Sequence, residues 1–144
     1  MAETTSQDQG SGTTAAATVR DVVVLRLPAQ GAYLSVLRTA TASLASRLDF
    51  TLDDIEDLRI AVDEACAMLL THAIAGADLE CSFELSPDAI AISVKVPTTD
   101  GTEPSRDTFA WTVLTALTGQ VDSSVDPDKN VTISLQKRRE VASQ

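Results

Sequence analysis

Apolar and polar residues alternate in several short segments of the chain, and apolar residues recur at helical spacing in longer ones. A period of two puts alternate side chains on opposite faces of a strand, whereas a period of about 3.6 gathers them on one side of a helix. The pattern predicts strands at residues 19–27, 77–85, 89–96, 120–125 and 130–136. It predicts helices at residues 30–48, from Leu52 to Gly76, and at residues 107–118.

The order of these elements is neither a regular strand-helix alternation nor a helical bundle. It predicts an α+β two-layer sandwich, with three main helices packed on one face of a mixed, mostly antiparallel sheet. Residues 1–18 are polar and lack apolar periodicity, which predicts a disordered tail, with a tether or docking segment as the alternative. We expect one domain over residues 19–137 and a short C-terminal tail over residues 138–144.

The second predicted helix carries the most informative pattern. It opens with Thr51-Leu-Asp-Asp54, which has the form of a capping box. Glu64 lies opposite the core face, with Ile60 one turn before it and Met68 one turn after it. It is either a partly exposed carboxylate beside incidental apolar residues, or a base or hydrogen-bonding group in a shallow pocket. His72 either caps the last carbonyls of the helix or takes part in chemistry.

The net charge of the chain limits the classes of molecule that it can bind. A net charge of -10 argues against binding nucleic acid, which needs clustered Lys and Arg. The basic run at residues 137–139 is interpreted as a solvated chain end.

Cys66 and Cys81 lack metal-binding spacing and are predicted to be buried, reduced thiols. No segment has the composition of a membrane span or a signal peptide, so we expect a cytoplasmic protein without a membrane partner.

The segment from Leu58 to Ala73, LRIAVDEACAMLLTHA, resembles the first ATP-site motif of the anti-sigma serine kinases of the RsbW/SpoIIAB-like family. That motif reads approximately V-x-E-A-x-x-N-x-x-x-H-[AG], and this chain keeps Val62, Glu64, Ala65, His72 and Ala73. The predicted order of elements matches from about Leu25 to Lys137. The resemblance implies the histidine-kinase-like ATPase fold.

The resemblance also implies a function. Members of this family bind a sigma factor, typically as homodimers, and release it when an anti-anti-sigma protein of the STAS type competes. Many also phosphorylate a serine of that antagonist with Mg-ATP, and Glu64 would then be the catalytic base. The resemblance therefore implies a sigma factor and an anti-anti-sigma protein as partners.

The sequence departs from the family pattern wherever Mg-ATP is held. Met68 replaces the asparagine that supplies a hard oxygen ligand, and a thioether is a poor substitute for it. Asp100-Gly101 is the only remnant of the adenine-binding D-x-G-x-G motif. Asp107-Thr-Phe-Ala-Trp111 replaces the phosphate-binding glycines, and Phe109 and Trp111 are expected to fill the space. We expect a vestigial pocket of Glu64, Met68, Asp100, Gly101 and Trp111, with no cofactor, no metal and no active catalytic residue.

Arg38 aligns with a basic residue of the first helix that engages the sigma factor in relatives. An arginine there can pair with a carboxylate of the partner in a bidentate manner, and an arginine on a solvated face is the alternative. Ser35, Thr39 and Arg47 are predicted to flank this surface. The expected function is sequestration of a sigma factor without phosphorylation. The alternatives are an active serine kinase of the same family and a regulatory scaffold.

Overall fold

The computed structural model describes residues 20–140, so the tail predicted for residues 1–18 lies outside the described residues. It contains the strands and helices that the sequence predicts, in the same order. These are β2 (Asp21–Pro28), η3 (Gly31–Tyr33), α2 (Leu34–Arg47), α3 (Leu52–Leu70), β3 (Asp78–Ser86), β4 (Ala89–Pro97), α4 (Phe109–Thr118), β5 (Gln120–Val125) and β6 (Asn130–Arg138).

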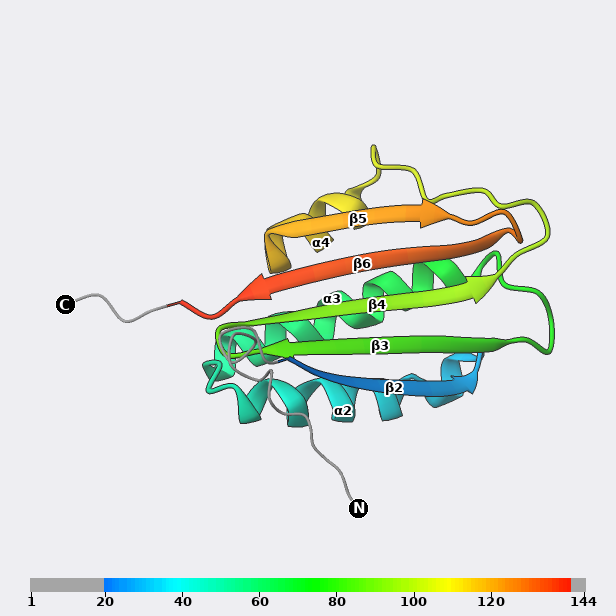
Figure 1. The fold of residues 1–144 in the computed structure, drawn as a ribbon. Coiled ribbons are helices and arrows are strands. Elements are labelled where there is room, and N and C mark those ends of the chain that lie inside the picture. Colours follow the sequence, from blue (N-terminus) through cyan, green and yellow to red (C-terminus); the bar gives the residue numbers. More distant parts are fainter. Residues whose placement is uncertain (1–19, 141–144) are drawn as a thin grey trace, which may run out of the picture.

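The five strands form one sheet in the order β2-β3-β4-β6-β5, and every neighbouring pair is antiparallel. The helices α2, α3 and α4 cover one face of this sheet, and no helix of the described chain covers the other face (Figure 1). The predicted α+β sandwich is therefore confirmed, with antiparallel pairing throughout the described sheet.

Period-two patterning builds the core on the helical side of the sheet. Cys81 lies opposite Val94 and Phe83 lies opposite Ile92, and all four side chains are buried. The fully buried Leu58 of α3 belongs to the same core. Only one face of each strand meets the helices, so the alternation in sequence directly sets which side chains are inside.

The helix α3 ends at Leu70, so the prediction that it continues to Gly76 is wrong. The Thr71 hydroxyl donates to the Met68 carbonyl at 2.9 Å, and the chain then leaves the helix. Ala73 forms an isolated bridge with Thr98, just beyond the end of β4. This pairing satisfies backbone groups that would otherwise continue the helix, and helical periodicity could not reveal it.

The interpretation of the basic run at the C-terminus as a solvated end is wrong for Lys137, whereas the Arg138 side chain is exposed as expected. Lys137 belongs to β6, and its side chain, which is only 15% exposed, contacts both α3 and α4. Its Nζ donates to the Leu117 carbonyl at 2.8 Å and lies 3.6 Å from the Asp54 carboxylate. The strand β6 extends to Arg138, and the Arg139 amide donates to the Asp88 carbonyl at 2.7 Å.

Candidate functional site

One flank of α3 carries Glu64 and Met68, two positions of the motif described above. At about 100° per residue, Asp57, Glu64 and Met68 fall on the same flank. Lys137 lies 4.0 Å from the Asp57 carboxylate and also binds the Leu117 carbonyl of α4, which identifies this flank as the one that faces α4. Glu64 is half-buried here, and no ion pair or side-chain hydrogen bond among residues 20–140 includes its carboxylate.

Two apolar side chains on this side of the molecule, Met68 of α3 and Trp111 of α4, are packed against the core, whereas Ile60, one turn before Glu64, is exposed. Met68 lies against the hydrophobic core, and Trp111 at the start of α4 is 8% exposed. The Thr108 hydroxyl accepts a hydrogen bond from the Trp111 amide at 3.2 Å and so caps α4, which turns the indole inward. The expectation that Trp111 fills space is confirmed. Phe109 was expected to do the same, but it is 83% exposed, because it lies on the opposite side of the first turn from the core.

The remnant of the adenine-binding motif forms a tight turn after β4. Asp100 is exposed, and its Oδ1 accepts a hydrogen bond from the Thr102 amide at 3.0 Å. This hydrogen bond is the main reason that the pKa of the Asp100 carboxyl is lowered. The Gly101 amide donates to the hydroxyl of the buried Thr98 at 2.8 Å. Asp100 therefore stabilises its own turn.

The loop of residues 99–108 is attached to β5, the outermost strand beyond β6. Arg106 donates to the Asp122 carboxylate at 2.7 Å, and the Ser123 hydroxyl donates to the Glu103 carboxylate at 2.7 Å. The arginine side chain is the main reason that the pKa of Asp122 is lowered. Figure 1 shows this loop running beside β5 before it enters α4. It lies along one edge of the sheet.

These features match Mg-ATP poorly. A metal ion bound with nucleotide needs oxygen ligands, and the position of the expected amide ligand holds the packed thioether of Met68. A phosphate chain needs free backbone amides at a glycine-rich turn, and α4 begins with a capped turn and a buried indole. Among residues 20–140, no group of three or more His, Cys, Asp or Glu side chains could hold a metal ion.

The predicted partner surface on α2 is divided by the fold. Arg38 faces α3 and donates two hydrogen bonds to the Asp63 carboxylate, at 2.9 and 3.0 Å. Ser35 and Thr39 lie on the other flank, in a groove of about 500 Å³ between α2 and β2. Arg47 lines a separate pocket at the end of the helix. The four predicted residues therefore do not form one cluster, and Arg38 is already paired.

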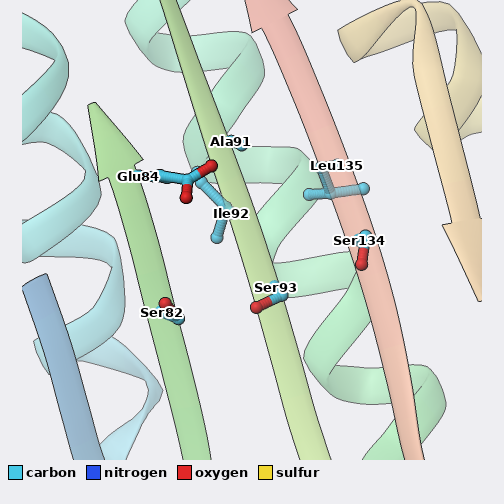
Figure 2. Close-up of a pocket in the computed structure, with 7 residues that line it drawn as sticks. All are labelled: Ser82, Glu84, Ala91, Ile92, Ser93, Ser134 and Leu135. Carbon is cyan, nitrogen blue, oxygen red and sulfur yellow. The ribbon is translucent and has the colours of Figure 1, made fainter. Parts of the chain in front are cut away.

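A second depression lies on the open face of the sheet, and the sequence did not predict it (Figure 2). Its volume is about 240 Å³, and small side chains at alternate positions of three strands create it. Its only charged group, Glu84, is paired with Arg20 at 3.1 Å. Within residues 20–140, no hydrogen bond joins its serine hydroxyls to the Glu84 carboxylate, which binds Arg20. The lining residues are Ser82, Glu84, Ala91, Ile92, Ser93, Ser134 and Leu135.

The two cysteines are free and buried, as the sequence predicted. Burial raises the pKa of the Cys66 thiol to about 12 and raises that of Cys81 as well. Both thiols are therefore protonated at neutral pH and poor nucleophiles. None of the described helices is both long and apolar enough to cross a membrane.

Comparison with solved structures defines the fold class. The chain is similar to a crystal structure of the RsbU and RsbW domains of a Mycobacterium tuberculosis protein, with a TM-score of 0.66 and 14% sequence identity. The match covers 86% of this chain and 34% of that chain. At this identity the likeness establishes the fold, which is the histidine-kinase-like ATPase fold of RsbW domains.

Comparison with curated sequences identifies similar proteins. The serine-protein kinase RsbW of Halalkalibacterium halodurans is 37% identical over 75 residues, which cover 51% of this chain and 46% of that protein. The serine-protein kinase RsbW of Bacillus subtilis is 43% identical over 53 residues, which cover 37% of this chain and 33% of that protein. No family profile matches the sequence. The chain is thus similar to RsbW proteins over segments that span less than half the length of each of these relatives.

Proposed function

We propose that this protein is an anti-sigma factor that sequesters a sigma factor and releases it when an anti-anti-sigma protein competes for it. The similarity to RsbW proteins in both sequence and fold supports this role and carries the proposal. The acidic charge of the chain suits a partner with a basic surface. We further propose that the protein acts as a homodimer in the cytoplasm.

We also propose that partner exchange proceeds by competition, without phosphorylation. The observation that supports this is the packed region beside Glu64, where Met68 and the buried Trp111 stand in place of a metal ligand and a phosphate-binding turn. A catalytic base cannot act without a positioned phosphoryl donor. On this proposal Glu64 is vestigial, and the protein needs no cofactor.

An active serine kinase is the second candidate, and one observation favours it. Glu64 is retained, and its carboxylate has no partner among the described residues, so it is available to accept a proton. The relatives in Halalkalibacterium and Bacillus carry the name serine-protein kinase. This candidate requires that Mg-ATP displace the packed side chains around Glu64.

The first experiment tests the partner. The full chain, carrying an affinity tag, is co-expressed with each alternative sigma factor of its source organism and purified. The proposal predicts a stable complex with at least one sigma factor, and its release on addition of the matching STAS-type protein. The absence of any sigma complex contradicts the proposal and favours a regulatory scaffold.

The second experiment tests the nucleotide. Calorimetry with Mg-ATP, followed by incubation of the protein with labelled ATP and a STAS-type protein, is expected to show no micromolar binding and no phosphate transfer. Binding together with transfer to a serine would establish the kinase. In that case Glu64→Gln should abolish transfer and leave binding intact.

A further inference from the structure

The first turn of α4 exposes a large aromatic side chain on a rigid element. Phe109 is 83% exposed, the highest value among the aromatic residues described as exposed. Its neighbours hold the turn in place, since Thr108 caps the helix and the Trp111 side chain is buried in the core. Exposed aromatic residues on ordered turns are typical of interface anchors, because little side-chain entropy is lost when they are buried by a partner.

Arg106 fixes the loop that leads into this turn. Its guanidinium lies 4.9 Å from the centre of the Trp111 ring and donates to both Asp122 and Ser123. We call these contacts the Arg106 clamp. They join the loop, α4 and β5, so the segment that precedes Phe109 has partners on two elements.

A close approach of the Gly101 backbone to side chains of the β5–β6 hairpin supports the same arrangement at the other end of the loop. Gly101 has a φ of +69°, and a Cβ atom there would lie 3.2 Å from the Val125 side chain at the end of β5. The Thr98 hydroxyl also donates to the Lys129 carbonyl at 2.8 Å. The loop is thus attached to the β5–β6 hairpin at both ends.

The loop that leads to Phe109 is negatively charged. The loop carries the carboxylates of Asp100, Glu103 and Asp107, and none of them forms an ion pair with a cation among residues 20–140. Its one basic residue, Arg106, is neutralised by Asp122. A surface of this kind complements an apolar pocket that is bordered by Lys and Arg side chains.

We propose that Phe109, held by the Arg106 clamp, is an anchor for the basic DNA-contacting surface of the sigma factor, and that this surface forms without nucleotide. A sigma factor contacts promoter phosphates, and such surfaces are rich in Lys and Arg. Occupation of that surface by an acidic protein also prevents promoter binding. The identity of the partner rests on the proposed function. The Arg106 clamp is independent of that function, because it consists of contacts within this chain.

The clamp is tested on the protein alone. Trp111 is the only tryptophan of the chain, so its fluorescence reports the clamp. Arg106→Ala is expected to change the emission of Trp111 and to raise amide hydrogen exchange of residues 99–108 at least about tenfold. Asp122→Ala should produce a smaller increase, because the stack on Trp111 remains. Arg138→Ala is the matched control, since it removes an exposed ion pair with Asp88 elsewhere. Unchanged exchange in Arg106→Ala overturns the clamp.

The anchor is tested on the sigma complex. Phe109→Ala is expected to weaken binding at least about tenfold, because a buried aromatic anchor dominates an interface. Leu52→Ala is the matched control, because Leu52 is 84% exposed on the first turn of α3, and it should change affinity less than about twofold. Arg106→Ala should weaken binding as well, and DNA carrying the promoter should compete with the wild-type protein.

The outcomes separate this inference from the proposed function. A wild-type protein that binds no sigma factor contradicts the proposed function, and with it the identity of the partner. A wild-type protein that binds tightly while Phe109→Ala binds equally well overturns the anchor and leaves the proposed function standing. Equal losses in Phe109→Ala and Leu52→Ala also overturn the anchor.

Discussion

Asp63 and Glu64 are neighbours in the sequence, yet they lie on different flanks of α3 and have different surroundings. Asp63 faces α2, where Arg38 donates two hydrogen bonds to its carboxylate. Glu64 faces α4, where Met68 and Trp111 are packed. Arg38 was expected to be free for a partner, but it forms an internal ion pair with Asp63. Glu64 was expected to be vestigial, but its carboxylate has no ion-pair partner among the described residues. The chemistry available to a partner therefore depends on the flank on which a residue lies.

The α4 flank depends most strongly on Trp111. Trp111→Ala should lower the free energy of unfolding by about 3–5 kcal/mol, since it leaves a cavity in the core. Denaturant unfolding followed by circular dichroism measures this loss, and Trp111→Phe should retain much of the stability. An equally stable Trp111→Ala protein would show that this region is loosely packed and has room for a ligand.

Lys137 is expected to stabilise the N-terminal end of the same flank of α3. Lys137→Met removes the charge that contacts Asp54, Asp57 and the Leu117 carbonyl, and should cost about 1–3 kcal/mol because these groups lose their partner. Lys95→Met is the control, since its ion pair with Glu80 is on the open face and more exposed. Equal costs in denaturant unfolding for both variants would assign Lys137 an ordinary surface role.

The α2 flank is tested by a double-mutant cycle of Arg38→Ala and Asp63→Ala. The two side chains are 36% and 38% exposed, so solvent screening should limit their coupling to below about 1 kcal/mol. If Arg38 also binds the sigma factor, Asp63→Asn should increase affinity, because a competing carboxylate is removed. An affinity that falls instead would mean that Asp63 positions Arg38 for the partner.

The smallest effect is expected at Glu64. Glu64→Gln keeps the shape of a side chain that has no ion-pair partner, so unfolding free energy should change by less than about 0.5 kcal/mol. Affinity for the sigma factor should also be unchanged. If the wild-type protein transfers phosphate and this variant does not, the proposal that partner exchange needs no nucleotide is contradicted.

Much of the fold follows from local patterns. The alternation in residues 89–96 predicted β4 almost to its ends, and the capping box at Thr51 placed the start of α3. These signals are local because a strand side chain faces inward or outward by parity, and a cap needs only the next three residues. The end of α3 was missed because the bridge between Ala73 and Thr98 joins segments far apart in the chain.

The arrangement of the candidate residues followed only in part from the sequence. The motif placed Glu64 and Met68 one turn apart, and the structure shows them on one flank. Sequence spacing gave no means to see that Arg38 is paired with Asp63, twenty-five positions further along the chain. The comparison with the family motif also gave Phe109 and Trp111 the same role, although only Trp111 is buried.

By itself, the sequence determined most of the elements, their order and the buried thiols, because each of these depends on residue type and local periodicity. Only the tertiary structure decided which charges are already paired, that Lys137 is inside the fold, and that Arg106 attaches a loop to β5. These outcomes depend on distances between segments that are remote in the sequence, and no local pattern encodes such a distance. The proposed anchor at Phe109 arises from that second kind of information.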